Sequence, residues 1–86
     1  MSVPVVDGAK QVIIAVPSNR KVTTVEDEGA FGTDIFSEFT KSIVSVGGAD
    51  ATASSIGAYA KNYNVYVYSP SAALGKNTYT VTIANS

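Results

Sequence analysis

The sequence predicts an all-β fold, a small antiparallel β-sandwich of about six strands, and three observations indicate it. Val and Ile account for 18 of the 86 residues whereas Leu occurs once, and β-branched side chains pack well on a pleated surface. Straight-chain helix formers are scarce, with three Glu and one Gln. Near the end of the chain, apolar residues alternate with Thr, which is typical of a sheet with one wet face.

Residues 1–9 are expected to form an extended N-terminal arm, and residues 10–86 a single β-sandwich domain. Pro4 lacks an N–H group and cannot occupy a central strand, and Asp7-Gly8 signals a turn. An apolar arm of this kind can add as a strand to the sheet edge of a neighbouring molecule. The alternative is that it pairs within its own sandwich. The candidate assembly arm consists of Val3, Pro4, Val5 and Val6.

The next two strands are predicted as a hairpin. Residues 11–16 form a short apolar strand that we expect to be buried on both faces, and residues 20–26 form a second strand. The three residues 17–19 between them have the length of a hairpin loop. The acidic loop that follows, Glu26-Asp27-Glu28, offers oxygen ligands for Ca²⁺, but it lacks alternating acidic spacing and a distal Glu, which favours a solvated loop.

The middle of the chain is ambiguous between a helical turn and a strand. Over residues 33–39, Asp34 can cap a helical turn that places Ile35, Phe36 and Phe39 on one apolar face; a strand is the alternative. Residues 41–46 are expected to be a strand, with a turn at Gly47-Gly48. Residues 49–58 are expected to be a loop, with one helical turn as an option.

The segment 62–68 carries the candidate binding face. The segment consists of two alternating rows of residues. One row is Tyr63, Val65 and Val67, and we expect its Val positions to face inward; the other row contains only Asn and Tyr. Exposed Tyr beside Asn suits a glycan- or protein-binding surface, because Tyr gives a large contact area at little entropy cost. The alternative is a half-buried face covered by a loop such as 49–58. The candidate binding residues are Asn62, Asn64, Tyr66 and Tyr68.

Residues 67–83 resemble the late part of bacterial immunoglobulin-like domains. A strand, Pro70, the turn residue Leu74 and the strand Tyr79-Thr-Val-Thr follow one another as they do in that family. The resemblance implies an immunoglobulin-like sandwich, with a jelly-roll-related one as the alternative. It also implies a tyrosine corner, in which Tyr79 would bond back to the preceding loop. The chain ends three residues after Ile83, which implies a permuted or short sheet, or an edge supplied by another chain.

The composition excludes several function classes. The chain has no His, Cys or Trp, so zinc sites built on thiolate or imidazole, disulfides and Ser-His or Cys-His nucleophile pairs are ruled out. A net charge of −1 does not attract nucleic acid or anionic lipid. The carboxylates of Asp34 and Glu38 are better explained as capping and surface groups than as an acid–base pair. We therefore expect no enzyme, no cofactor, no metal, no nucleic acid partner and no membrane partner.

Two functions remain as expectations. The first is a structural assembly protein with protein partners, either itself or a larger capsid or surface assembly. Its most concrete form is a small phage virion component, a capsid decoration or head-fibre subunit assembled in the host cytoplasm. The initial Met and the absence of a signal-like segment favour a complete frame that folds in the cytosol. The alternative is an immunoglobulin-like adhesion or carbohydrate-binding module at the cell surface that binds glycan.

Overall fold

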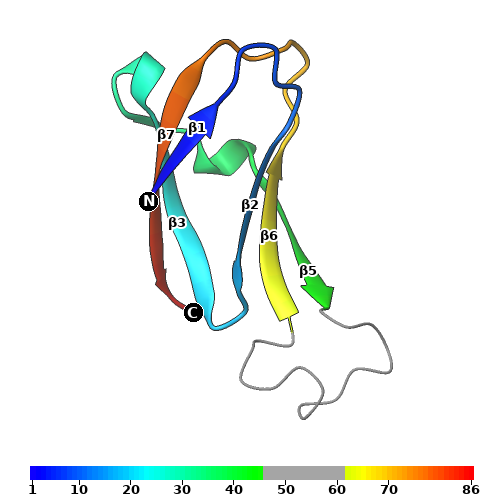
Figure 1. Cartoon of the computed structure of the whole chain (residues 1–86). Helices are drawn as coiled ribbons and strands as arrows, with labels where there is room; N and C mark the ends of the chain where they lie inside the picture. Colours follow the sequence, from blue (N-terminus) through cyan, green and yellow to red (C-terminus); the bar gives the residue numbers. More distant parts are fainter. Residues whose placement is uncertain (46–61) are drawn as a thin grey trace.

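The chain forms two antiparallel sheets that pack face to face, which confirms the predicted small β-sandwich (Figure 1). The computed structural model describes residues 1–45 and 62–86. The sheets have the strand orders β1-β7-β3-β4 and β2-β6-β5, and two short 3₁₀ turns, η1 and η2, flank β4. The bounds are β1 Ser2–Val5, β2 Val12–Pro17, β3 Arg20–Asp27, η1 Glu28–Ala30, β4 Thr33–Asp34, η2 Phe36–Glu38, β5 Thr40–Ser45, β6 Asn62–Tyr68 and β7 Asn77–Asn85.

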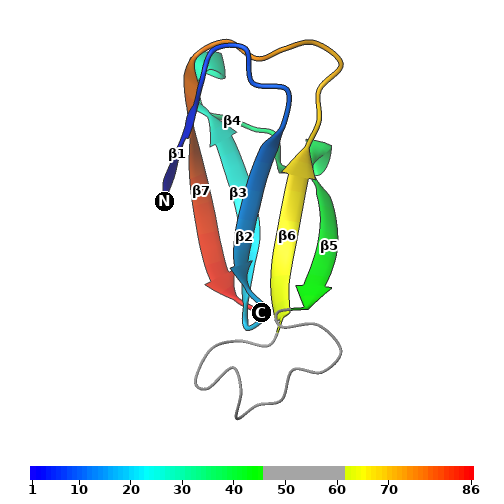
Figure 2. The same ribbon diagram turned by 45° about the vertical axis from the view of Figure 1, so that its right-hand side comes forward.

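The predicted hairpin between the second and third strands is wrong. β2 pairs with β6, whereas β3 pairs with β7 and β4, so the short connection crosses from one sheet to the other (Figure 2). β2 is also buried on one face only, since its residues alternate between buried and exposed. An inward row of Val12, Ile14 and Val16 needs an apolar layer opposite, and crossing the sandwich brings Val22 and Val25 of β3 into that layer.

A β-bulge explains how β3 turns two valines to the core. Val22 and Val25 are three positions apart, so a regular strand would place them on opposite faces. The register with β7 shifts between Val22 and Thr24, which leaves Thr23 as the additional residue. Both valines are consequently buried. On β7 the expected alternation is confirmed, with Tyr79 and Val81 buried and the intervening threonines more exposed.

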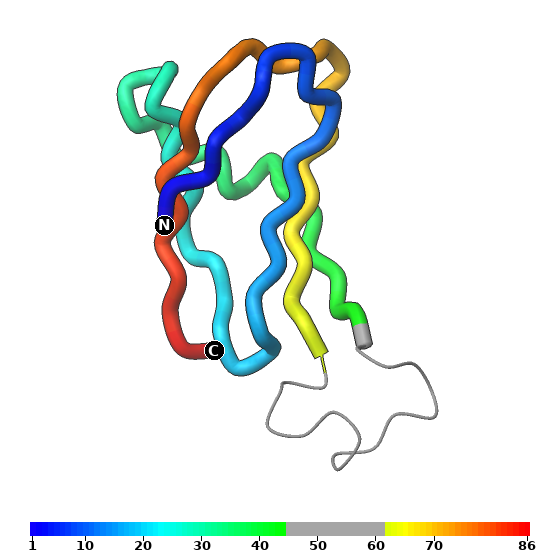
Figure 3. The backbone as a smooth tube through the Cα atoms, in the orientation of Figure 1, coloured from blue at the N-terminus to red at the C-terminus, as the bar shows by residue number. Residues whose placement is uncertain are grey.

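The arm pairs within its own sandwich, as the alternative interpretation had it. β1 is an edge strand that pairs with β7 from Ser2↔Thr80 to Val5↔Asn77, and Pro4 lies on this edge. The N-terminal ammonium group donates a hydrogen bond to the carbonyl oxygen of Val81 at 2.9 Å. At the other end of the chain, Ser86 contacts the β2–β3 turn through its backbone N–H and its hydroxyl (Figure 3).

The helical turn expected within residues 33–39 is present as η2. The carboxylate oxygen Oδ1 of Asp34 accepts hydrogen bonds from the backbone N–H of Phe36 at 3.0 Å and of Val25 at 2.9 Å. This side chain therefore joins the first residue of the turn to β3. Asp34 is not the N-cap residue itself, since Ile35 occupies that position and the turn has no side-chain cap. The turn at Gly47-Gly48 and the loop at 49–58 lie outside the described residues.

Candidate functional site

The expected binding face on β6 points into the sandwich, so the predicted exposure of Asn64 and Tyr66 is wrong. Asn64 is 5% exposed and Tyr66 is 2% exposed. The Asn64 amide Nδ2 donates to the carbonyl oxygen of Arg20 at 2.7 Å, and the Tyr66 hydroxyl accepts from the backbone N–H of Val22 at 3.2 Å. Both hydrogen bonds link the two sheets, which assigns these side chains a structural role. Asn62 and Tyr68 are half-buried on the same face.

The register with β2 gives the physical reason for this orientation. Ile14 lies opposite Tyr66 and Val12 opposite Tyr68, and residues opposite each other in an antiparallel pair lie on the same face. Because the valine and isoleucine row of β2 enters the core, the Tyr row of β6 must enter it as well. The aromatic rings also pack against the η2 segment, with Phe36 and Tyr66 centroids 5.6 Å apart and Phe39 and Tyr68 centroids 5.4 Å apart.

The other side of the β2-β6-β5 sheet is therefore the surface of the molecule (Figure 2). The side chains that the register places there are mostly apolar. Ile13 is 58% exposed and Val44 is 48% exposed. None of the nine side chains at these positions is charged. We call this surface the apolar outer face; the register places on it Ile13, Ala15 and Pro17 of β2, Tyr63, Val65 and Val67 of β6, and Thr40, Ser42 and Val44 of β5.

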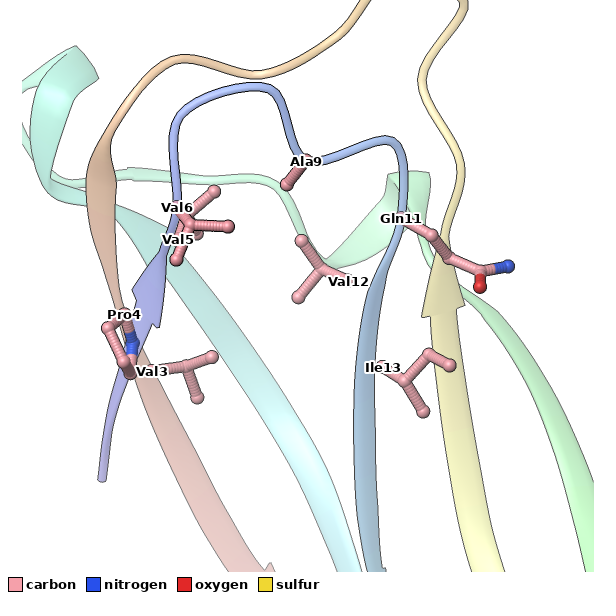
Figure 4. A pocket seen from close by; sticks show the side chains of 8 residues that line it. All are labelled: Val3, Pro4, Val5, Val6, Ala9, Gln11, Val12 and Ile13. Atoms are coloured by element: carbon pink, nitrogen blue, oxygen red, sulfur yellow. The ribbon is translucent and has the colours of Figure 1, made fainter.

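The four residues of the expected assembly arm line a pocket between the edge strands β1 and β2 (Figure 4). The pocket has a volume of about 190 Å³, and we call it the β1–β2 pocket. The connection above it is fixed, because the backbone N–H of Gly8 donates to Leu74 and that of Leu74 donates to Ala9, both at 2.8 Å. The lining residues carry no charge: Val3, Pro4, Val5, Val6, Ala9, Gln11, Val12 and Ile13.

Sequence reasoning missed the most exposed aromatic side chain among the described residues, which belongs to Phe31. It follows η1 at the tip of the β3–β4 connection, and its exposure reaches 104% of the reference value. Its backbone adopts the left-handed conformation, with φ 58° and ψ 36°. The available signal was a bulky aromatic residue between Ala30 and Gly32 in an otherwise acidic and glycine-containing loop.

The acidic loop is held by hydrogen bonds to β7. Asn77 donates through Nδ2 to Oδ1 of Asp27 at 2.6 Å, and its own Oδ1 accepts from the backbone N–H of Gly29 at 3.0 Å. The hydroxyl of Thr80 donates to Oε1 of Glu28 at 2.8 Å. Within the part of the chain that the structure describes, no three metal-binding side chains come together to hold an ion.

Tyr79, the residue expected at a tyrosine corner, is buried on the inner face of β7. Burial raises the pKa of its hydroxyl above the ordinary value, and the negative charge of Asp27 and the proximity of Tyr68 raise this pKa further. The hydroxyl-to-backbone bond that ties β6 to β3 is made by Tyr66.

Comparison with known proteins identified no relative: no family model, no curated protein and no solved structure matches the chain. No helix among residues 1–45 and 62–86 has the length and apolar character needed to cross a lipid bilayer.

Proposed function

We propose that this chain is a non-enzymatic structural assembly subunit, most concretely a small phage virion component such as a capsid decoration or head-fibre subunit assembled in the host cytoplasm. The observation that supports the proposal is the apolar outer face of the β2-β6-β5 sheet, on which Ile13 is 58% and Val44 48% exposed. Large apolar patches on a folded surface mark sites of protein contact. A subunit that docks on a larger shell would use such a face.

The chemistry of this face indicates what kind of partner it fits. Full burial of an Ile or Val side chain contributes about 1.5–3 kcal/mol relative to exposure, so covering Ile13 and Val44 stabilises a complex by a few kcal/mol. Because none of the nine side chains carries a charge, the face has no means of recognising a charged surface. The partner surface is therefore apolar protein rather than nucleic acid or anionic lipid.

The test compares two double substitutions that add the same charge. The outer-face variant, Ala15→Lys with Val44→Lys, places two positive charges at exposed positions of the apolar outer face. The β7 variant, Thr78→Lys with Thr82→Lys, places two positive charges at exposed positions of β7. Tagged protein is purified from cells that naturally contain it, and negative-stain electron microscopy and sedimentation record whether it accompanies large particles. We expect the wild type and the β7 variant to accompany them and the outer-face variant to lose them. A wild-type chain found only as a free monomer contradicts the proposal.

The alternative, an adhesion or carbohydrate-binding module, stands second. This alternative depended on an exposed row of Asn and Tyr on β6. Asn64 and Tyr66 are instead buried, and both form hydrogen bonds with the backbone of β3. Loss of glycan affinity in a Tyr66→Ala variant would therefore reflect damage to the core. A glycan screen with the wild-type chain, followed by Tyr63→Ala on the outer face, is the appropriate test of this alternative.

A further inference from the structure

The loop that carries Phe31 is ordered by hydrogen bonds, and its aromatic ring is exposed to solvent. We call residues 28–32 the Phe31 loop. The backbone N–H of Gly32 donates to Asp27 at 2.9 Å, and the hydroxyl of Thr33 donates to the carbonyl oxygen of Ala30 at 2.6 Å. Two residues before Phe31, the backbone N–H of Gly29 donates to Oδ1 of Asn77 at 3.0 Å. Hydrogen bonds before and after Phe31 in the chain therefore hold the backbone from which its side chain leaves the surface.

Two features of Phe31 are unfavourable in an isolated molecule. A φ of 58° is uncommon for a bulky residue, whereas Asn and Gly adopt it readily. A fully exposed aromatic ring also forgoes the free energy of burial. Backbone strain that the surrounding structure maintains occurs preferentially at functional sites such as ligand clamps and switch regions. The sequence thus retains, at one position, both a strained backbone and an unburied ring.

The β1–β2 pocket has the size and character to receive such a ring. The pocket is open to solvent on one side, and its volume of about 190 Å³ is large enough for an aromatic ring, since an enclosed cavity of ~150 Å³ holds benzene. Valines and Ile13 form most of its wall, and Val6 at its rim is 69% exposed. Without a charged lining residue, the pocket suits a neutral aromatic group.

We propose that Phe31 of one copy inserts into the β1–β2 pocket of a second copy. This contact rests on the proposed assembly function, since it supplies a way for subunits to join each other. The Phe31 loop and the connection from β1 to β2, which carries part of the pocket lining, lie at the same end of the sandwich (Figure 3). Asn77 connects them, because it pairs with Val5 of the pocket and accepts from Gly29 of the loop. In the proposed dimer, a two-fold axis relates the copies, and each copy supplies one ring and one pocket.

The area of this contact predicts a weak dimer. A Phe ring buries about 150–250 Å² and covers a comparable area of pocket wall, so two reciprocal contacts bury about 800 Å² in total. Stable dimers usually bury more than about 1,200 Å². The dimer is accordingly expected at high protein concentration, or where a larger assembly holds the copies side by side.

Sedimentation velocity over protein concentrations from about 10 μM to about 1 mM tests this contact. We expect the wild type to approach a dimer, and Phe31→Ala and Val6→Glu each to raise the dissociation constant at least ~30-fold, as truncation of a buried aromatic anchor does. Both positions are exposed in the monomer, so the fold is kept. Ile43→Ala, at another exposed apolar position, is the control and should leave the dimer unchanged.

A mixing experiment separates a direct contact from an indirect effect. In an equimolar mixture, Phe31 of the Val6→Glu chain meets the intact pocket of the Phe31→Ala chain, so the mixture should associate more strongly than either variant alone. Absence of this complementation, a wild-type monomer throughout, or a dimer insensitive to Phe31→Ala overturns the inference. The inference is also overturned if Ala15→Lys with Val44→Lys abolishes the dimer and Phe31→Ala does not. That result would still support the proposed assembly function.

Discussion

The two outer faces of the sandwich differ in chemistry although they belong to sheets of similar size. Outward positions of the β1-β7-β3 sheet carry mainly hydroxyl and charged groups, whereas the apolar outer face of β2-β6-β5 carries no charge. The register places Thr78, Thr80 and Thr82 of β7 and Lys21, Thr24 and Glu26 of β3 on the first face. The first sheet therefore presents groups that water solvates well, whereas the second leaves uncharged and mainly apolar side chains at the surface.

The same alternating pattern therefore has opposite meanings in β7 and β6. In β7 the apolar members of the alternation face inward and Thr faces water. In β6 the Val row is half-buried on the outer face, and the row of Asn and Tyr enters the core. A Tyr side chain can be buried because its ring packs in the core while its hydroxyl forms a hydrogen bond with a backbone group. The Tyr66 hydroxyl accepts such a bond from the N–H of Val22. Alternation alone gives no sign of which row is inside.

We expect the largest effect from substitutions that test which row of β6 faces the core. Tyr66→Ala removes a fully buried ring and leaves the N–H of Val22 without its acceptor, so we expect the free energy of unfolding to fall by about 3–5 kcal/mol. The matched substitution Tyr63→Ala, one face over on the same strand, should cost no more than about 1 kcal/mol. Urea denaturation of both variants measures the difference, and equal losses would contradict the assigned orientation.

Phe31→Asn is expected to stabilise the monomer. Asn adopts the left-handed conformation at lower cost than Phe, and Phe31 makes no buried contact that would be lost. We expect a gain of about 1 kcal/mol, within the range assigned to a left-handed residue. Thermal unfolding at low protein concentration checks the sign. A decrease in melting temperature would mean that the ring contributes to the monomer fold.

Val65→Thr should have a small effect because Val65 lies on the outer face. Thr keeps the β-branched shape and adds a hydroxyl that reaches water. We expect a change within about 0.5 kcal/mol, as for surface positions. The same exchange at Val81, which is 2% exposed on β7, buries a hydroxyl and should cost about 1–3 kcal/mol. Denaturant midpoints of the two variants sharpen the distinction between outer and inner rows.

The alkaline limit of stability should depend on Tyr79. Its pKa is raised in the folded chain, chiefly by burial and then by the charge of Asp27. Below about pH 10, the unfolded value, both states are protonated and the full stability is present. As pH rises from there through the folded pKa, the unfolded chain loses the proton first and stability falls. Tyr79→Phe should reduce this alkaline slope in denaturation curves; an unchanged slope would exclude Tyr79 as its source.

Much of the fold could be predicted from the sequence because strand-forming residues and turn residues are well separated. Three features follow from local chemistry: the edge position of Pro4, the inward row of Tyr79 and Val81, and the hydrogen bond from the first residue of η2 to Asp34. The pairing partner of β2 does not, since it depends on contacts with β6, some fifty residues away. The candidate surfaces depend on that pairing, which determines whether Val65 or Tyr66 faces water.

The β-bulge in β3 has a consequence for how this gene tolerates insertions and deletions. Thr23 is one residue more than the ladder with β7 requires, so loss of that single codon would leave Val22, Thr24 and Val25 in regular alternation with both valines still facing inward. Loss of one codon in the middle of β7 would instead turn every later side chain of that strand to the opposite face. Natural length variation in this chain should therefore be accommodated at Thr23 and be rare in β7.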